Sequence, residues 1–314
     1  MFHLVTLWLS EILSLTPETH LYEAVIFFVE DILKIFSLLF IMMGIMTFLR
    51  LHLPIEKMKR FMTHTPFGVT HFMAAILGAV TPFCSCSSLP LFFTFLRSGI
   101  SLGATFSFLA TSPLVNEVAL VLLWGIFGTK FMLFWLISAI TLGTVIGMVF
   151  ELLHLERFIT PDFSASANTS HQEIQKGLFA KIRYSIEQSF HLTRKVALFI
   201  IVGIGIGAVI HGFVPQEFFL EKMSITSPLA IPITVLLAVP FYSNASGIIP
   251  VIQSLIVKGV PLGTALAFMM AIVGLSLPEA MILKKAMQWK LLALFFGSVA
   301  IAIMIIGFLG NRIF

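Results

Sequence analysis

The sequence predicts an all-α polytopic membrane protein with two homologous halves, whose broken or re-entrant helices meet at the membrane midplane. Composition is the first observation: 58% of the 314 residues are hydrophobic and 11% are charged, whereas about 25% are charged in a typical soluble domain. The second observation is a pair of polar, proline-bracketed segments inside apolar sequence, at residues 81–90 and 239–250. The third is that landmarks of the first half return in the same order in the second half.

Apolar runs divide the chain into four parts. Residues 1–20 form a short amphipathic lead that lacks the basic start, long apolar run and cleavage site of a signal peptide. Residues 21–151 are expected to be the first membrane repeat, with a first crossing over Tyr22–Leu51, and residues 194–314 the second repeat. The polar stretch 152–193 between them is predicted to be a cytoplasmic linker.

The most informative stretch is Thr81–Pro90, which contains both cysteines of the chain, Cys84 and Cys86. Because proline removes a helical hydrogen bond and clashes with the preceding turn, Pro82 and Pro90 predict a break in the helix. Broken backbone at membrane depth is tolerated where it is buried in protein or lines an aqueous cavity, and we expect a cavity here. In an extended or irregular segment, thiols two residues apart project to one side and could bind one soft ion together.

The same plan recurs in the second half. Pro82 corresponds to Pro240 (240 − 82 = 158), so Tyr242 and Asn244 are expected to stand where the two cysteines stand. Matching interruptions in two halves are the best sequence pointer to the substrate site of a transporter. The expected structural breaks are Pro82, Pro90, Pro113, Pro240, Pro250 and Pro278.

Basic residues favour an inverted arrangement of the two halves. If each polar segment is the tip of a re-entrant hairpin, each half crosses the membrane three times and the second half is inserted upside down. The basic clusters at 57–60 and 284–290 and the linker then share one face, as the enrichment of Lys and Arg on the cytoplasmic side requires. Full crossings would make the halves parallel and would separate the 57–60 cluster from the linker. We therefore expect inverted repeats.

Three motifs resemble those of a known family: Thr81-Pro-Phe-Cys-Ser-Cys-Ser-Ser-Leu-Pro90, Arg97-Ser-Gly-Ile-Ser-Leu-Gly103 and Thr111-Ser-Pro-Leu-Val-Asn-Glu117. With them the chain resembles the bacterial permease family that includes organoarsenical and antimonite exporters, over roughly Ile35 to Phe308. This resemblance implies a membrane permease and favours trivalent organoarsenicals or antimonite as the transported solute.

Thiol chemistry is compatible with such a solute. A trivalent arsenic atom with one organic group has two remaining valences, which two thiolates would fill, whereas inorganic arsenite or antimonite would need a third ligand. Soft Cu(I) also binds thiolates. We expect the substrate to contact both polar segments, with the cysteines as ligands of the transported metal or metalloid: Cys84, Cys86, Ser85, Ser87, Ser88, Tyr242, Ser243 and Asn244.

Two carboxylates are candidates for coupling or gating. Glu117 and Glu279 each follow a proline in apolar sequence, at matching points of the halves (279 − 117 = 162), and an ionisable residue buried in a membrane costs at least ~2.5 kcal/mol. Asn116 is expected to assist them. The alternative is that each carboxylate caps the N-terminus of a half-helix. His71 and His64 are seven residues apart, and we expect them to lie at the interface rather than to form a metal relay.

The sequence therefore predicts a gradient-driven permease of the bacterial inner membrane that exports a small thiophilic solute. It contains no phosphate-binding loop, metalloprotease motif or nucleophile elbow, so we expect no enzyme activity and no cofactor. The expected partners are the lipid bilayer and the solute, with a separate energising or chaperone protein as a further possibility and no nucleic acid. Alternatives are a Cu(I)-like exporter, an importer of a sulfur-containing metabolite, and an intramembrane thiol redox protein, although redox motifs place two residues between their cysteines.

Overall fold

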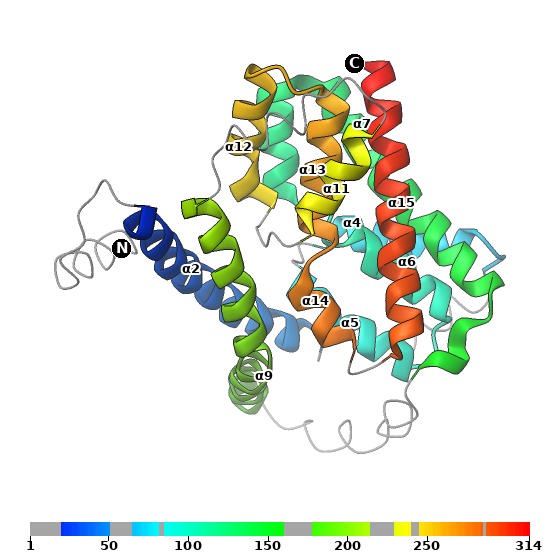
Figure 1. Ribbon diagram of the computed structural model, residues 1–314. Coiled ribbons are helices and arrows are strands. Elements are labelled where there is room, and N and C mark those ends of the chain that lie inside the picture. The colour runs from blue at the N-terminus through cyan, green and yellow to red at the C-terminus, as the bar shows by residue number, and fades with distance from the viewer. Residues whose placement is uncertain are drawn as a thin grey trace.

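The computed structural model describes residues 20–50, 65–81, 85–159, 178–213, 229–239, 245–284 and 287–314. The first half contains α2 (His20–Arg50), α4 (Val69–Val80), α5 (Ser85–Arg97), α6 (Leu102–Thr111) and α7 (Glu117–Leu152), followed by the short 3-10 helix η1 (Leu155–Phe158) (Figure 1). The second half contains α9 (Leu178–Phe213), α11 (Ala230–Ala238), α12 (Ala245–Val257), α13 (Leu262–Gly274), α14 (Leu277–Leu283) and α15 (Trp289–Ile313).

These helices confirm the all-α class. Outside them, the described residues contain one isolated antiparallel β-bridge, between Ile159 and Met287. α9 begins at Leu178, so helical structure extends into the range expected to be linker. The expected N-terminal lead, apart from His20, lies outside the described residues.

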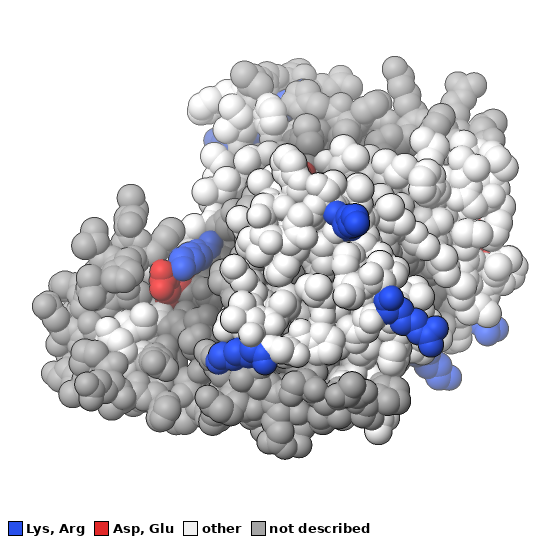
Figure 2. All heavy atoms as spheres, turned by 90° about the horizontal axis from the view of Figure 1, so that it is seen from above, with Lys and Arg blue, Asp and Glu red and all other residues white. Residues whose placement is uncertain are grey.

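The helices and their surface suit a lipid environment. Among the described residues, three stretches are long and apolar enough to cross a membrane: Ala119–Leu152, Leu262–Met281 and Trp289–Ile313. Large apolar side chains such as Ile137 and Ile301 are exposed on the outside. Figure 2 shows separate Lys and Arg side chains on a mostly uncharged face. Such a surface is stable against lipid tails and would be a large aggregation-prone patch in water.

The two halves repeat each other in structure. α5 and α12 begin 160 residues apart (245 − 85), and so do α6 and α13 (262 − 102). α5 and α12 also end alike, at Gly99 with φ 75° and at Gly259 with φ 96°. In each case the next residue donates its N–H to a carbonyl five residues earlier, as Ile100 does to Phe95 at 3.1 Å. This helix ending needs a left-handed residue, which explains the two glycines.

The first helices of the two halves, α2 and α9, pack against each other along their lengths and run antiparallel (Figure 1). Gly44, near the end of α2, lies against Ser189, near the start of α9. Phe28, near the start of α2, lies against Gly205, near the end of α9. The two contacts are equivalent in the repeat, because both members of each shift by 161 residues (205 − 44 and 189 − 28).

The last long helices of the two halves are also antiparallel. Gly128, with φ 80° and ψ 174°, interrupts α7 and divides it into residues 117–127 and 129–152. The second part of α7 packs along α15. Phe131 meets Phe314 with ring centroids 5.5 Å apart, and Phe150 meets Phe295 at 6.2 Å. The start of each helix therefore lies beside the end of the other.

α4 and α5 form a helical hairpin. The N-terminal ends of α4 and α6 meet where His71 lies beside Gly103, and their C-terminal ends meet where Gly78 lies against the Phe108 carbonyl. α4 and α6 are thus parallel neighbours, so α5 must return the chain from the end of α4 to the start of α6. The 12 residues of α4 span about 18 Å, too short for the ~30 Å hydrocarbon core.

Two prolines do not act as predicted. Pro90 and Pro250 lie inside α5 and α12, which continue through them. In the first half the chain leaves helical geometry earlier, at Thr81, whose φ of −85° and ψ of 124° are extended. The fixed φ of proline is itself helical, so proline can remain in a helix whose freed carbonyl finds another partner. Pro113 does lie in a break, between α6 and α7, and Pro278 lies in the first turn of α14, where no backbone N–H is needed.

Candidate functional site

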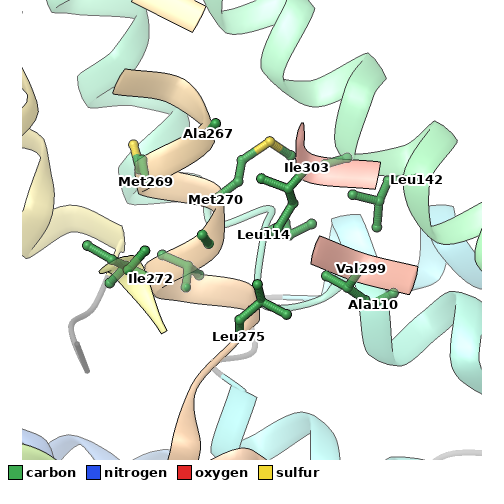
Figure 3. Packing of buried hydrophobic residues seen from close by; sticks show 14 of the residues in the cluster. Ala110, Leu114, Leu142, Ala267, Met269, Met270, Ile272, Leu275, Val299 and Ile303 are labelled. Atoms are coloured by element: carbon green, nitrogen blue, oxygen red, sulfur yellow. The ribbon is translucent and has the colours of Figure 1, made fainter. Parts of the chain in front are cut away.

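Chain breaks from both halves meet near the centre of the molecule. A Cβ placed on Gly78, at the end of α4, would lie 3.2 Å from the backbone nitrogen of Ser112 in the α6–α7 break. A Cβ on Gly274, at the end of α13, would lie 3.2 Å from Leu114 in the same break. Figure 3 shows Leu114 and Leu275, one from each half, in a single buried cluster. The ends of α4 and α13, one from each half, therefore both contact the α6–α7 break.

The α6–α7 break is held by specific hydrogen bonds. Trp135, whose side chain is fully buried, donates its indole N–H to the Leu114 carbonyl at 2.9 Å. Asn116 accepts the N–H of Ala119 on its Oδ1 at 3.2 Å and so caps α7. Asn116 is consequently explained by helix capping, the structural alternative to a role in coupling.

The two candidate carboxylates differ in environment. Glu117 is exposed, whereas Glu279 is 3% exposed and its Oε2 has no hydrogen-bond partner among the described residues. α7 begins at Glu117 but α14 begins at Leu277, so Glu279 lies two residues further into its helix. Two residues turn a helix by about 200°, which places the carboxylates on opposite helix faces. Ser276, one turn before Glu279, is 2% exposed and its hydroxyl likewise lacks a partner within the described ranges.

The cysteine segment begins α5. Cys86 lies in the first turn of that helix, so the segment is helical from Ser85 onward and not extended as predicted. Ser88 is completely buried. Only the backbone of Ser85, Cys86 and Ser87 is described, and Pro82, Cys84, Pro240, Tyr242, Ser243 and Asn244 lie outside the described residues.

The helix boundaries change the expected equivalence of the two polar segments. α5 and α12 have equal length and an offset of 160, so Ser246 takes the place of Cys86 (246 − 86). Asn244 instead immediately precedes α12, as Cys84 immediately precedes α5. The offset of 160 pairs Asn244 with Cys84, whereas the offset of 158 read from Pro82 and Pro240 pairs it with Cys86. Asn244 lies outside the described residues, so its equivalence stays a prediction.

α5, which begins in the cysteine segment, and α14, which contains Glu279, are neighbouring helices. The two helices contact each other, α5 also contacts α2, and α14 also contacts α9 (Figure 1). The candidate residues thus lie on helices that meet the α2–α9 pair. Within the described ranges, no three His, Cys, Asp or Glu side chains gather to hold a metal ion.

Sequence reasoning missed a polar pair at the start of the hairpin. His71, only 1% exposed, lies with its Nε2 3.1 Å from Oε2 of Glu151 at the end of α7. In the second half, Asn311 of α15 stands at the position of Glu151 (311 − 151 = 160). Its side chain exchanges two hydrogen bonds of 3.0 Å with Thr264 of α13. His71 and Glu151 are 80 residues apart, and no local pattern links them; only the repeat register could have suggested the comparison.

A family model described as "Predicted permease" matches residues 20–311. The chain is similar to UPF0718 protein YraQ of Escherichia coli, with 24% identity over 244 residues covering 76% of this chain and 68% of the relative. It is similar to UPF0718 protein MJ0584 of Methanocaldococcus jannaschii, with 21% identity over 311 residues covering 81% and 85%. It also matches a Streptococcus mutans protein named as a candidate subunit of a two-component membrane permease complex, at 23% over 277 residues covering 86% and 89%. No solved structure matches.

Proposed function

Because this chain belongs to the predicted permease family, we propose that it exports a small thiophilic solute across the bacterial inner membrane. A trivalent organoarsenical is the favoured solute, followed by antimonite and a Cu(I)-like soft ion. The observation that supports this most is the position of the cysteines: Cys84 lies in the connection between the two half-helices of the hairpin, and Cys86 lies in the first turn of α5. In transporters built from repeats, the substrate site typically lies where helices are interrupted near the membrane midplane.

The binding step exchanges oxygen for sulfur on the metalloid. Two S–H groups of Cys84 and Cys86 react with the two As–OH groups of an organoarsenous acid, forming two As–S bonds and releasing two water molecules. The Ser85, Ser87 and Ser88 hydroxyls and the second-half residues Tyr242, Ser243 and Asn244 are proposed as further contacts. The hydroxyl of serine is too hard a ligand to replace either thiol.

We propose that the halves are inverted repeats in the membrane. The antiparallel pairing of α2 with α9, and of α7 with α15, supports this arrangement. Lys130 and Arg312 lie at one end of the bundle, since Phe131 contacts Phe314. The linker start lies at the other end beside the start of α15, where the Gln288 N–H bonds the Phe158 carbonyl at 3.0 Å. The second end is the more basic and is assigned to the cytoplasm.

We assign coupling to Glu279 and not to Glu117. A buried carboxyl group without a partner is stable when it holds a proton and must find water or a cation when it releases it. Glu279 is buried and its Oε2 has no partner among the described residues, whereas Glu117 is exposed. Protonation of Glu279 is therefore proposed to alternate with solute binding on the neighbouring α5.

A protein partner is also proposed. The Streptococcus mutans relative is named as a subunit of a two-component membrane permease complex, and this chain contains no nucleotide-binding loop of its own. A second protein could supply energy or deliver the solute on the cytoplasmic side.

The test is uptake into everted membrane vesicles. Methylarsenite, antimonite and Cu(I) would be offered to vesicles that contain wild-type protein or Cys84→Ser. We expect uptake of at least one soft solute by the wild type and loss of that uptake in the variant at equal expression. Equal uptake of all three solutes by both proteins and by empty vesicles would reject export of a thiophilic solute.

A further inference from the structure

The His71–Glu151 pair lies outside the cysteine segment and at the base of the hairpin. α4 is held there to α6 and to the end of α7. His71 is the third residue of α4 and 1% exposed, and Glu151 is the penultimate residue of α7, with its side chain 31% exposed. Glu151 therefore reaches water while its partner does not. The contact connects a buried imidazole to the surface at the end of the bundle that bears the linker.

Close helix packing defines the geometry of this contact. A Cβ on Gly103 of α6 would lie 2.6 Å from Nε2 of His71 and 2.6 Å from Oε2 of Glu151. It would also collide with the Gly147 carbonyl of α7. The absence of a side chain at Gly103 is thus what allows His71 and Glu151 to meet.

One nitrogen of the imidazole is bonded and the other is not. Nε2 contacts Glu151, whereas Nδ1 is buried and has no hydrogen-bond partner among the described residues. The edge of the ring packs against Phe67 at a centroid distance of 5.2 Å. A neutral His71 that donates from Nε2 leaves only an acceptor unpaired. A proton on Nδ1 would add a buried N–H without an acceptor and a buried positive charge, both of which are costly.

Among the described residues, few other charged groups lie on the helices packed against the ring. α6 has no titratable side chain along its length, and the other charged residues of α7, Glu117 and Lys130, lie far from Glu151 along that helix. In the described residues that follow α7, the titratable groups are His154, Glu156 and Arg157, all exposed. Glu151 is consequently the one described group that can offset a charge on His71, and its own exposure weakens that effect through solvent screening.

The second half lacks this chemistry. The position of His71 is taken by Ile231 (231 − 71 = 160), and that of Glu151 by Asn311 (311 − 151 = 160). Asn311 bonds Thr264 through neutral groups that do not titrate between pH 5 and pH 8. The bonds of Asn311 join α15 to α13, and the second hairpin meets α15 through an apolar contact, in which Ile231 of α11 lies against Gly307. The first hairpin therefore has a titratable contact with its long helix where the second hairpin has an apolar one.

We propose that the His71–Glu151 pair is a proton-binding site that controls how firmly the α4–α5 hairpin is held against α7. Without the extra proton, α4 stays packed against the end of α7, and we call this contact the latch. Binding of a proton to His71 favours a released state, in which α4 moves away from α7 and the imidazole reaches water. In a transporter with two inverted halves, a proton-sensitive latch in one half and a proton-insensitive one in the other would bias the open face according to pH. That consequence rests on the proposed function, whereas the latch itself does not.

Hydrogen–deuterium exchange of the full chain in lipid nanodiscs tests the latch without any transport assay. Amide exchange in α4 and α11 would be followed between about pH 5 and pH 8, after correction for the intrinsic pH dependence of the chemistry. We expect acid to increase the corrected exchange of α4 by about fivefold, the factor that corresponds to loss of one net hydrogen bond. α11 serves as the internal control and should not respond.

Two variants act in opposite directions. His71→Gln keeps a donor for Glu151 but does not titrate, so the acid response of α4 should disappear. Glu151→Gln keeps the hydrogen bond but removes the charge that offsets protonation, so the acid response should grow. An equal acid response of α4 and α11 in the wild type, or an unchanged response of α4 in His71→Gln, would overturn the proposal. The wild-type comparison decides even if a variant does not fold.

Discussion

Replacing Gly103 by alanine should destabilise the protein, although alanine is the better helix former. The added Cβ would lie 2.6 Å from both His71 and Glu151, about 0.7 Å closer than an ordinary carbon–oxygen contact of ~3.3 Å. The Gly147 carbonyl is nearer still, so α6 and α7 must separate. Overpacking costs about 1–3 kcal/mol and loss of the His71–Glu151 hydrogen bond ~1 kcal/mol, against a gain of ~1 kcal/mol in helix propensity.

The net expectation is a loss of about 1–3 kcal/mol in the free energy of unfolding. Thermal unfolding in nanodiscs measures it, with Gly125→Ala and Gly297→Ala as matched controls, because no atom lies within 4 Å of a Cβ added to either. The controls should match or exceed the wild-type midpoint. If Gly103→Ala unfolds at the same temperature as the two controls, the close α6–α7 crossing and the hairpin base described above are wrong.

Three further predictions concern topology, coupling and the central break. Reporter fusions near Asn168 should be cytoplasmic and fusions after Arg312 periplasmic, and the same location for both would reject inverted repeats. Glu279→Gln should retain solute binding but lose transport driven by a pH gradient, whereas Glu117→Gln should transport normally; normal transport by both would remove the carboxylates from coupling. Trp135→Phe leaves the buried Leu114 carbonyl without its 2.9 Å donor, so unfolding should become easier by about 1–3 kcal/mol, and an unchanged unfolding midpoint would show that the indole does not hold the break.

Hydropathy and repeat spacing were sufficient to predict the helical class, the two halves and the break before α5. The effect of Pro90 and Pro250 could not be predicted, because proline at a fixed helical φ interrupts a helix only when its lost hydrogen bond has no substitute. The residue equivalent to Asn244 also depends on which repeat offset is used. The offset of 158 between Pro82 and Pro240 pairs Asn244 with Cys86, and the offset of 160 between the starts of α5 and α12 pairs it with Cys84.

Side-chain environment was the part that sequence could not supply. Glu117 and Glu279 occupy similar sequence contexts, yet a two-residue difference in helix start leaves one exposed and one buried. His71 and Glu151 are joined by the packing of α4, α6 and α7, which depends on the glycines at their crossing. Such contacts follow from tertiary structure and have no local signature.

The central claim is that the two thiols at the hairpin tip bind one soft atom together. The most direct measurement is titration of free thiols in the purified protein with phenylarsine oxide, a trivalent arsenical with one organic group. One equivalent should remove both thiols at once, release of the arsenical by a dithiol should restore both, and Cys84→Ser or Cys86→Ser should each abolish tight binding. Thiols that remain reactive after one equivalent, or equally tight binding by either serine variant, would contradict a shared thiol site.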